Sequence, residues 1–287
     1  MAEGKGTPTP KQGAEARQSK PWTLKELWGK PVWDWTQLGL QILGALLIPA
    51  AIAYVGWQYT SDLDARQRDA EERRAQDLTL QGYFDAMSTL VLEDRRDSEV
   101  LDVMRARTLT TLETLDPSHK PDVMRFLMGA HLVQGANKGK SRISLNEADL
   151  HDTGLPPNAD LTGAKLEQAN LHGAELPQSF LADASLVDAD LSDTNMYGAH
   201  LQSTDLTHAD LSGAGLENTD LRDSNLLGTD LNDADLSGAD LSDARGLTNE
   251  QIAASSKTLE GATMPNGQKY EDWLKEREKD GENSGPS

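Results

Sequence analysis

The sequence contains no cysteine, so neither disulfide bonds nor thiolate chemistry can contribute to the fold or to a reaction. It also lacks a phosphate-binding glycine loop, a nucleophile elbow and the ligand spacings of zinc sites. Charged residues are absent between Asp34 and Asp62. Basic residues are scarce further on, because residues 144–247 hold 20 Asp and Glu but only three Lys and Arg. We therefore expect neither an enzyme nor a cofactor.

Leucine recurs every five residues from Leu161 to Leu241. Of the 17 positions in this series, sixteen are Leu and one is Met196. The residue two positions before each of them is small at every site: Ala at eleven, Thr at four and Ser at two. A period of five matches neither the α-helical nor the β-strand period. A different structural unit must therefore repeat.

Each five-residue unit combines a short extended face with a corner. On an extended backbone, side chains two positions apart point the same way, so the small residue and the leucine face inward together. The residue between them points outward and is Asp at eight sites and Asn at three. The two residues after each leucine are mostly Ser, Gly, Asp and Asn, which turn a chain readily. Such units must stack to bury their leucines, and four faces per turn predict a square coil.

Three segments carry a resemblance to a known family. Residues 209–213 (ADLSG), 239–243 (ADLSD) and 169–173 (ANLHG) resemble the A(D/N)LxX unit of pentapeptide-repeat proteins. The resemblance implies a mainly β fold class, a right-handed quadrilateral β-helix, which we place at residues 143–247. One transmembrane helix and a small α-helical region are expected to precede it.

The transmembrane prediction depends on residues 35–59, which contain no charged side chain. Residues 38–57 are predominantly apolar over about the length needed to cross a bilayer. A buried core helix is the alternative, but the length and the lack of charge favour a single-pass helix that contacts the lipid bilayer. Aromatic residues flank the segment, as in the aromatic belts of membrane proteins: Trp33, Trp35, Tyr54, Trp57 and Tyr59.

The charges around this segment do not fix its orientation. Four Lys and Arg lie within about 20 residues before it and four after it. By analogy with pentapeptide-repeat proteins, which are often cytosolic, we expect the C-terminal part on the cytoplasmic side of a bacterial cell membrane. The mildly basic tail, residues 1–34, and the final residues 280–287 are expected to be disordered.

Between the apolar segment and the repeat, residues 60–140 have helical patterns. Residues 60–77 are dense in alternating charge, which is typical of a solvated stalk helix. Three further segments resemble the helical region that precedes the repeat in membrane-anchored bacterial pentapeptide-repeat proteins. We expect them to form a three-helix unit that caps the start of the β-helix. The segments are YFDAMSTLVLE, RARTLTTLETLD and VMRFLMGAHLV.

Two interruptions mark the ends of the strict repeat. The leucine spacing rises to six residues at Pro156 and Pro157, where we expect a bulge or loop. The far end needs a cap, because an open coil exposes unpaired strand edges. Residues 248–279 are expected to supply it, beginning with a short helix whose capping box is Thr248 and Gln251.

The aspartates raise the question of metal binding, but the repeat itself explains them. Residues one coil turn apart stack, so Asp190, Asp210 and Asp230 would form an outward ladder about 4.8 Å apart. Cations, or simply water and salt, would ease the repulsion along it, and the solvated ladder is the simpler hypothesis. We expect no metal site. The histidines of the repeat fall in different columns and do not converge as ligands: His172, His200 and His208.

One outward column departs from the acidic rule. It contains Asp160, Phe180, His200, Asp220 and Asp240 in succession. Phe180 and His200 are expected to be stacked neighbours, with Tyr197 across the corner. An exposed aromatic cluster on an acidic wall is a candidate partner patch. The alternative is that these rods tolerate irregular outward residues.

Since no active site is evident, the function must be carried by surfaces. We expect a non-catalytic, membrane-anchored scaffold that presents an acidic rod to a protein partner. A partner that binds through this acidic surface is basic. The alternative is a DNA mimic that binds DNA gyrase or another nucleic-acid-binding protein, since some cytosolic pentapeptide-repeat proteins resemble an acidic duplex to DNA gyrase. Direct binding of nucleic acid is not expected, and one uncharged span argues against a transporter. The sequence leaves open whether the chain forms a homo-oligomer.

Overall fold

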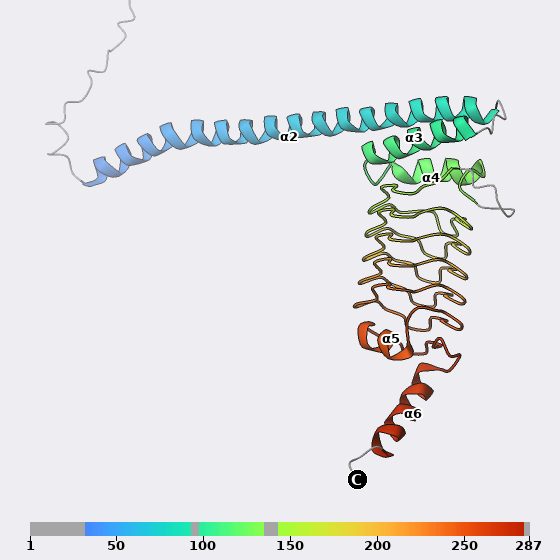
Figure 1. Ribbon diagram of the computed structural model, residues 1–287. Helices are drawn as coiled ribbons and strands as arrows, with labels where there is room; N and C mark the ends of the chain where they lie inside the picture. The colour runs from blue at the N-terminus through green and yellow to red at the C-terminus, as the bar shows by residue number, and fades with distance from the viewer. Residues whose placement is uncertain (1–31, 93–97, 135–142, 284–287) are drawn as a thin grey trace, which may run out of the picture. The chain divides into compact units, whose positions relative to one another are not determined.

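The computed structural model describes residues 32–92, 98–134 and 143–283, with the backbone alone at residues 32–49 and 280–283. The chain divides into two compact units, Met1–Asp69 and Ala70–Ser287. Figure 1 shows the helices and the stacked coil of the second unit.

The first described element is helix α2, Val32–Leu92. It is one continuous helix, where the sequence suggested a span, a stalk and a further helix. Every side chain described from residue 50 to residue 75 is exposed. Because α2 begins at Val32, the last three residues of the tail predicted to be disordered, 1–34, are helical. The rest of that tail lies outside the described residues.

Among the described residues, none of the helices combines the length and the apolar character that a membrane-spanning segment requires. The predicted span, residues 35–59, lies within the bounds of α2. Its residues 35–49 lie outside those whose side chains are described.

In the second unit, the end of α2 packs with α3, Ser98–Thr114, and α4, Lys120–Gly129. Their facing sides hold Met87, Met104, Leu112, Val123 and Leu127, all at most 2% exposed. Pro121 stands at the start of α4, where a missing backbone N–H is tolerated. The aromatic rings of the layer contact one another edge-on or tilted: Tyr83, Phe84 and Phe126.

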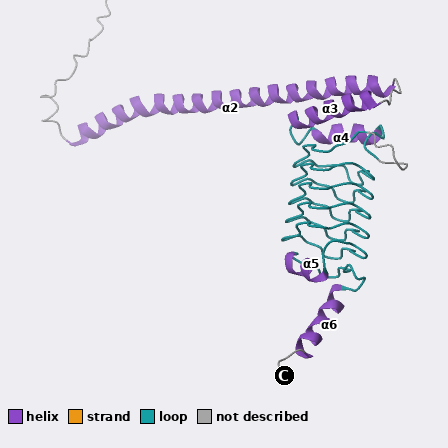
Figure 2. Ribbon diagram, in the orientation of Figure 1, coloured by secondary structure: helices purple, strands orange, loops and turns teal. Residues whose placement is uncertain are grey.

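The repeat forms a four-sided coil of parallel turns. Outward residues pair with those one turn away, as in the parallel bridges Asp160↔Phe180 and Phe180↔His200. The N–H of Leu161 donates to the carbonyl of Phe180, while the N–H of Phe180 donates to the carbonyl of Ala159. Each face is only one bridge long, so the coil of the described chain appears as loop rather than strand in Figure 2. The predicted inward file is confirmed, because every leucine of the five-residue series from Leu161 to Leu241 is at most 1% exposed.

The corners explain the residues that follow each leucine. The N–H of Ala164 donates to the carbonyl of Leu161, which closes a four-residue turn. The third residue of that turn, Gly163, has φ +63°. The equivalent corner residue has positive φ in every unit of the strict repeat, which favours glycine, aspartate and asparagine.

The outward aspartates have a structural role that the sequence did not disclose. At all eight sites, one carboxylate oxygen accepts a hydrogen bond from the N–H of the residue two positions on. The outward asparagines at 170, 195 and 225 make the same bond. The side chain thereby satisfies a corner N–H that points away from the coil. This bond, as well as solvent exposure, explains why Asp and Asn dominate the outward positions.

The register shifts where the sequence predicted a bulge. Gly154 pairs with Glu175, 21 residues on, whereas Asp160 pairs with Phe180, 20 residues on. The extra residue is absorbed at the Pro156 corner, where Asn158 has φ +62°. The prediction of a bulge or loop at Pro156 and Pro157 is confirmed.

The coil continues beyond its predicted end at residue 247. Helix α5, Asn249–Ser255, begins with the predicted capping box between Thr248 and Gln251. After it, Thr258 pairs with Asp235 and Thr263 with Asp240, so Leu259 and Met264 extend the inward file. Helix α6, Tyr270–Asn283, follows, and its Trp273 is buried. Residues 280–283, predicted to be disordered, belong to α6, while 284–287 lie outside the described residues.

Candidate functional site

The structure brings the three residues of the predicted patch together on one wall of the coil. Phe180 and His200 are successive members of one outward column, and Tyr197 occupies the corner that leads into His200. The rings of Phe180 and His200 lie parallel, with centroids 4.9 Å apart and an interplanar angle of 3°. The spacing equals about one turn of the coil, so the backbone register sets the stack. Phe180 is 39% exposed and Tyr197 47% exposed.

The aromatic patch lies between carboxylates. Asp160 is one turn above Phe180 in the same column. Glu217 is the corner residue one turn from Tyr197, because the N–H of Gly198 donates to its carbonyl. Neither Asp160 nor Glu217 has a Lys or Arg partner in the described part of the chain. Both carboxylates therefore remain available to a cation from outside.

Further along the column, the carboxylate of Asp220 is already paired. The side chain of Arg222 donates to both of its oxygens, at 2.8 and 2.6 Å, and Gln202 donates to it as well. Partial burial raises the pKa of Asp220, but the hydrogen bonds from Arg222 and Gln202 outweigh it and hold this pKa below its ordinary value. The two carboxylates of this column that flank the rings thus differ, since Asp160 has no basic partner among the described residues and Asp220 is paired with Arg222.

One other column carries a regular run of exposed aspartates. Asp190, Asp210 and Asp230 are successive bridge partners, as the sequence predicted. Within the residues that the structure describes, no group of three or more His, Asp or Glu is arranged to hold a metal ion. His172 and His208 do not lie in the column of His200. The Nδ1 of His172 forms a hydrogen bond with the hydroxyl of Ser192.

Sequence reasoning missed one buried charge at the start of the coil. Lys120, in α4, is fully buried, and its Nζ lies 3.0 Å from Asp149 and 3.3 Å from the Nδ1 of His151. Burial raises the pKa of Asp149, but hydrogen bonds from His151 and Lys120 and the charge of Lys120 lower it below the ordinary value. This cluster joins the helices to the first coil turn. No sequence signal marks it, because it depends on how α4 docks on the coil.

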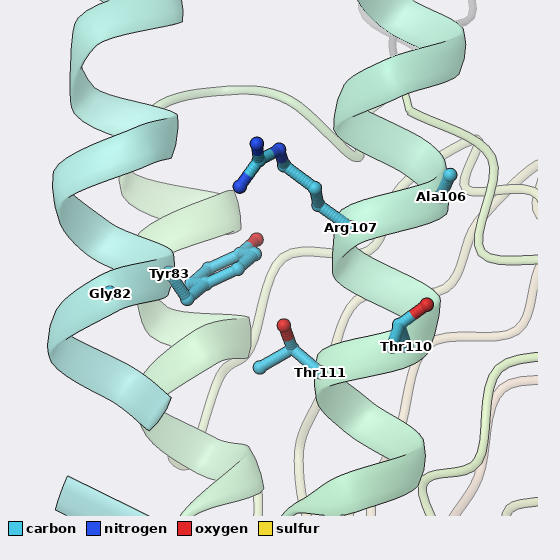
Figure 3. Close-up of a pocket in the computed structure, with 6 residues that line it drawn as sticks. All are labelled: Gly82, Tyr83, Ala106, Arg107, Thr110 and Thr111. Carbon is cyan, nitrogen blue, oxygen red and sulfur yellow. The ribbon is translucent and has the colours of Figure 1, made fainter. Parts of the chain in front are cut away.

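A pocket of about 350 Å³ lies between α2 and α3 (Figure 3). Gly82, Tyr83, Ala106, Arg107, Thr110 and Thr111 line it. The Tyr83 hydroxyl lies 3.0 Å from that of Thr108, and burial raises the pKa of Tyr83 to about 12. A phenol so held does not ionise near neutral pH. None of the six described residues that line the pocket is a carboxylate or a histidine.

These features define a class of protein: a solenoid of five-residue units whose variable surface lies outside a uniform core. The family model described as pentapeptide repeats matches residues 158–193, 178–213 and 209–245, in 8 copies. The chain belongs to the pentapeptide-repeat family, whose β-helix is right-handed.

Solved structures of this family are similar to the chain over its repeat. A pentapeptide repeat protein from the thylakoid lumen of Arabidopsis thaliana is 28% identical, with 46% of this chain and 86% of that chain covered and a TM-score of 0.32. HetL, involved in the regulation of heterocyst differentiation in the cyanobacterium Nostoc, is 30% identical, with coverages of 45% and 77% and a TM-score of 0.20. QnrB1, a plasmid-mediated fluoroquinolone resistance protein, is 18% identical, with coverages of 46% and 64% and a TM-score of 0.23. No curated protein matches the chain in sequence.

Proposed function

We propose that this protein is a non-catalytic scaffold, anchored to a membrane by residues 35–59, whose β-helix presents an acidic wall to a basic protein partner. The observation that carries the proposal is the arrangement of the outward carboxylates. Each is fixed by its bond to a corner N–H, and successive carboxylates stack at the spacing of the coil. Such a wall attracts cationic surfaces with little loss of side-chain freedom on binding.

The scaffold role is tested by removing charge without altering the fold. The triple variant Asp190→Asn, Asp210→Asn and Asp230→Asn keeps an oxygen for each corner N–H, as the natural asparagines do. Capture from bacterial membranes on the full-length protein should then lose the partners that bind through charge. The matched control is Asn170→Ser and Asn225→Ser, which changes outward residues without changing charge. Equal partner sets for the triple variant and the wild type would contradict the proposal.

Membrane anchoring is supported by the described end of the apolar segment. Ile52, Tyr54, Val55, Trp57 and Tyr59 are large apolar side chains with 58–67% of their surface exposed. Exposure of so many neighbouring apolar side chains is unfavourable in water and favourable in lipid. In flotation with phospholipid vesicles, Ile52→Arg with Val55→Arg should leave the protein in the aqueous fraction. The control Ala70→Arg, in the charged part of α2, should float as the wild type does.

The proposed orientation places the β-helix on the cytoplasmic side of a bacterial cell membrane. Added protease should digest the β-helix in lysed spheroplasts but spare it in intact ones. Digestion in intact spheroplasts would place it on the opposite side and would exclude every cytoplasmic partner.

DNA mimicry is the second candidate, and the regular carboxylate ladders favour it. A supercoiling assay of DNA gyrase with residues 70–287, the second compact unit, tests it directly. Inhibition of supercoiling, or protection from a gyrase inhibitor, would support mimicry. Unchanged activity and unchanged inhibition would rule out gyrase as the partner.

A further inference from the structure

We infer that Phe180 and His200, with the carboxylate of Asp160, form a binding site for an arginine side chain of a partner protein. The inference rests on the proposed scaffold function and names the chemistry by which one wall of the β-helix would recognise its partner.

The first observation is a hydrogen bond that this site forgoes. Every outward Asp and Asn of the strict repeat accepts a bond from the corner N–H two positions on, including Asp160 above the patch and Asp220 below it. A phenyl ring cannot accept that bond, so Phe180 leaves its corner without this support. The Nδ1 of His200 instead lies 3.4 Å from the side-chain nitrogen, Nε2, of Gln202. Six of the 17 outward positions of the strict repeat hold neither Asp nor Asn, and at two of them, adjacent in one column, the residues are aromatic.

The second observation is the orientation of the rings. Phe180 lies between Asp160 and His200 in the column, and its ring is parallel to that of His200 at 4.9 Å. One face of the phenyl ring is therefore covered by the imidazole. The other face is turned toward Asp160, one coil turn away. A cation that approaches from outside can lie over this face and meet the carboxylate at the same time.

The third observation is the state of the carboxylates. Asp160 uses its Oδ1 for the N–H of Thr162, which leaves Oδ2 free to accept from a ligand. Glu217 lies in the turn of Asp220, beyond His200, and its carboxylate is close to Gly215 on the neighbouring wall, so it is not part of the site. The site thus offers one open aromatic face next to one unpaired carboxylate. Charge complementarity, on a chain of formal net charge −20, indicates a cationic occupant.

Arginine fits this combination better than lysine does. Its guanidinium is planar, stacks on aromatic rings and donates in a fork that matches a carboxylate. Lysine offers the same charge as a compact, strongly hydrated ammonium. Preference for arginine over lysine therefore separates this site from the general attraction of an acidic wall.

The test measures binding of two labelled peptides to the full-length protein in mild detergent by fluorescence anisotropy. The peptides are acetyl-Gly-Arg-Gly-Ser-Arg-Gly-amide and its lysine counterpart, which has the same charge. We expect the arginine peptide to bind about five- to tenfold more tightly, within the range of cation–π contributions. Equal binding of the two peptides to the wild type would overturn the inference.

The decisive variant is Phe180→Asn with His200→Asn. Asparagine is the natural outward residue at 170, 195 and 225, where it makes the corner bond, so the variant should unfold at a temperature no lower than the wild type. The variant should nevertheless bind the arginine peptide and the lysine peptide with about equal affinity. If the preference survives in this folded variant, the rings do not bind the guanidinium and the inference is wrong.

Carboxylate variants localise the charge. Asp160→Asn should weaken the binding of both peptides by about threefold or more, whereas Asp210→Asn, in a column on the opposite wall, should change it by less than about twofold. Equal losses from the two variants would show attraction to the whole rod and no site. If the wild type and Phe180→Asn with His200→Asn capture the same membrane partners, this inference fails while the scaffold function stands. If the wild type captures none, the scaffold function fails as well.

Discussion

The buried ion pair between Lys120 and Asp149 predicts an asymmetry between substitutions at its two ends. The Lys120 side chain is fully buried in α4, with the Asp149 carboxylate 3.0 Å from its Nζ. Asp149→Asn would leave a buried ammonium without an anionic partner. Breaking a buried pair in this way typically costs about 3–5 kcal/mol. Because Asp149 itself keeps 30% exposure, we expect a somewhat smaller loss of about 2–4 kcal/mol in the free energy of unfolding.

Substitution at the other end should be milder. Lys120→Met keeps the length of the buried stem and removes the charge. The carboxylate of Asp149 retains the ring of His151 and contact with water, so we expect a loss of at most about 1.5 kcal/mol. Urea unfolding of the full-length protein, followed by circular dichroism at pH 7, measures both values. A loss for Lys120→Met equal to or larger than that for Asp149→Asn would refute this reasoning.

The same pair has a predictable pH dependence. The pKa of Asp149 is lower in the folded chain than its ordinary value, so its contribution to stability is present above the unfolded pKa, about 3.9. It is lost as the pH falls through the lower, folded pKa. The difference in stability between the wild type and Asp149→Asn should therefore be full near pH 6 and shrink below about pH 4. A difference that stays constant down to pH 3 would contradict the assigned ion pair.

Further predictions concern the coil itself. Leu211→Arg should cost more than about 4 kcal/mol and collapse the coil, because it places a charge in the leucine file; Asp210→Arg should cost only about 0.5–1.5 kcal/mol, the loss of one corner bond. Equal unfolding midpoints for the two would refute the inward file. Gly246→Ala should cost about 3 kcal/mol or more, since φ is +98° and a Cβ would lie 2.2–2.6 Å from backbone atoms of Leu226 and Leu227, one turn earlier in the coil. Gly228→Ala should cost less, about 1–2 kcal/mol, because the atoms it meets belong to the exposed side chain of His208, which can move. Thermal unfolding that ranks the two glycine variants in the reverse order would contradict this account.

The parts of the fold that could be predicted are those set by local repetition. The leucine period places the inward file, the outward columns and the Phe180–His200 stack, because each depends only on counting residues along the coil. The end of the coil was predicted too early, since α5 interrupts the count by three residues between Arg245 and Thr258. The sequence does contain the signal for the continuation: Ala262 stands two positions before Met264, and Leu259 stands five before it.

Other features depend on contacts that a period cannot encode. The buried Lys120 is set by the docking of α4 on the first coil turn, and nothing near it in the sequence indicates a partner 29 residues away at Asp149. The corner bonds of the outward aspartates could not be predicted, because they depend on the direction in which each carboxylate points, and the period does not give that direction. Sequence reasoning assigned these residues outward, which is correct, but attributed their abundance to exposure alone.

The corner bonds alter how the acidity of the rod is interpreted. Asp and Asn make the same corner bond, and Lys165 and Gly215 occupy outward positions without it, so the coil requires no negative charge at these positions. The coil is thus indifferent to the choice between Asp and Asn, and eight Asp against three Asn is a choice that folding does not explain. Phe180 and His200 are among the six outward positions of the strict repeat that hold neither Asp nor Asn, and they are the two that hold aromatic rings. Because outward residues can change without disturbing the leucine file, substitutions there separate binding from stability. A variant such as Phe180→Asn with His200→Asn therefore tests what the wall binds while the coil beneath it is unchanged.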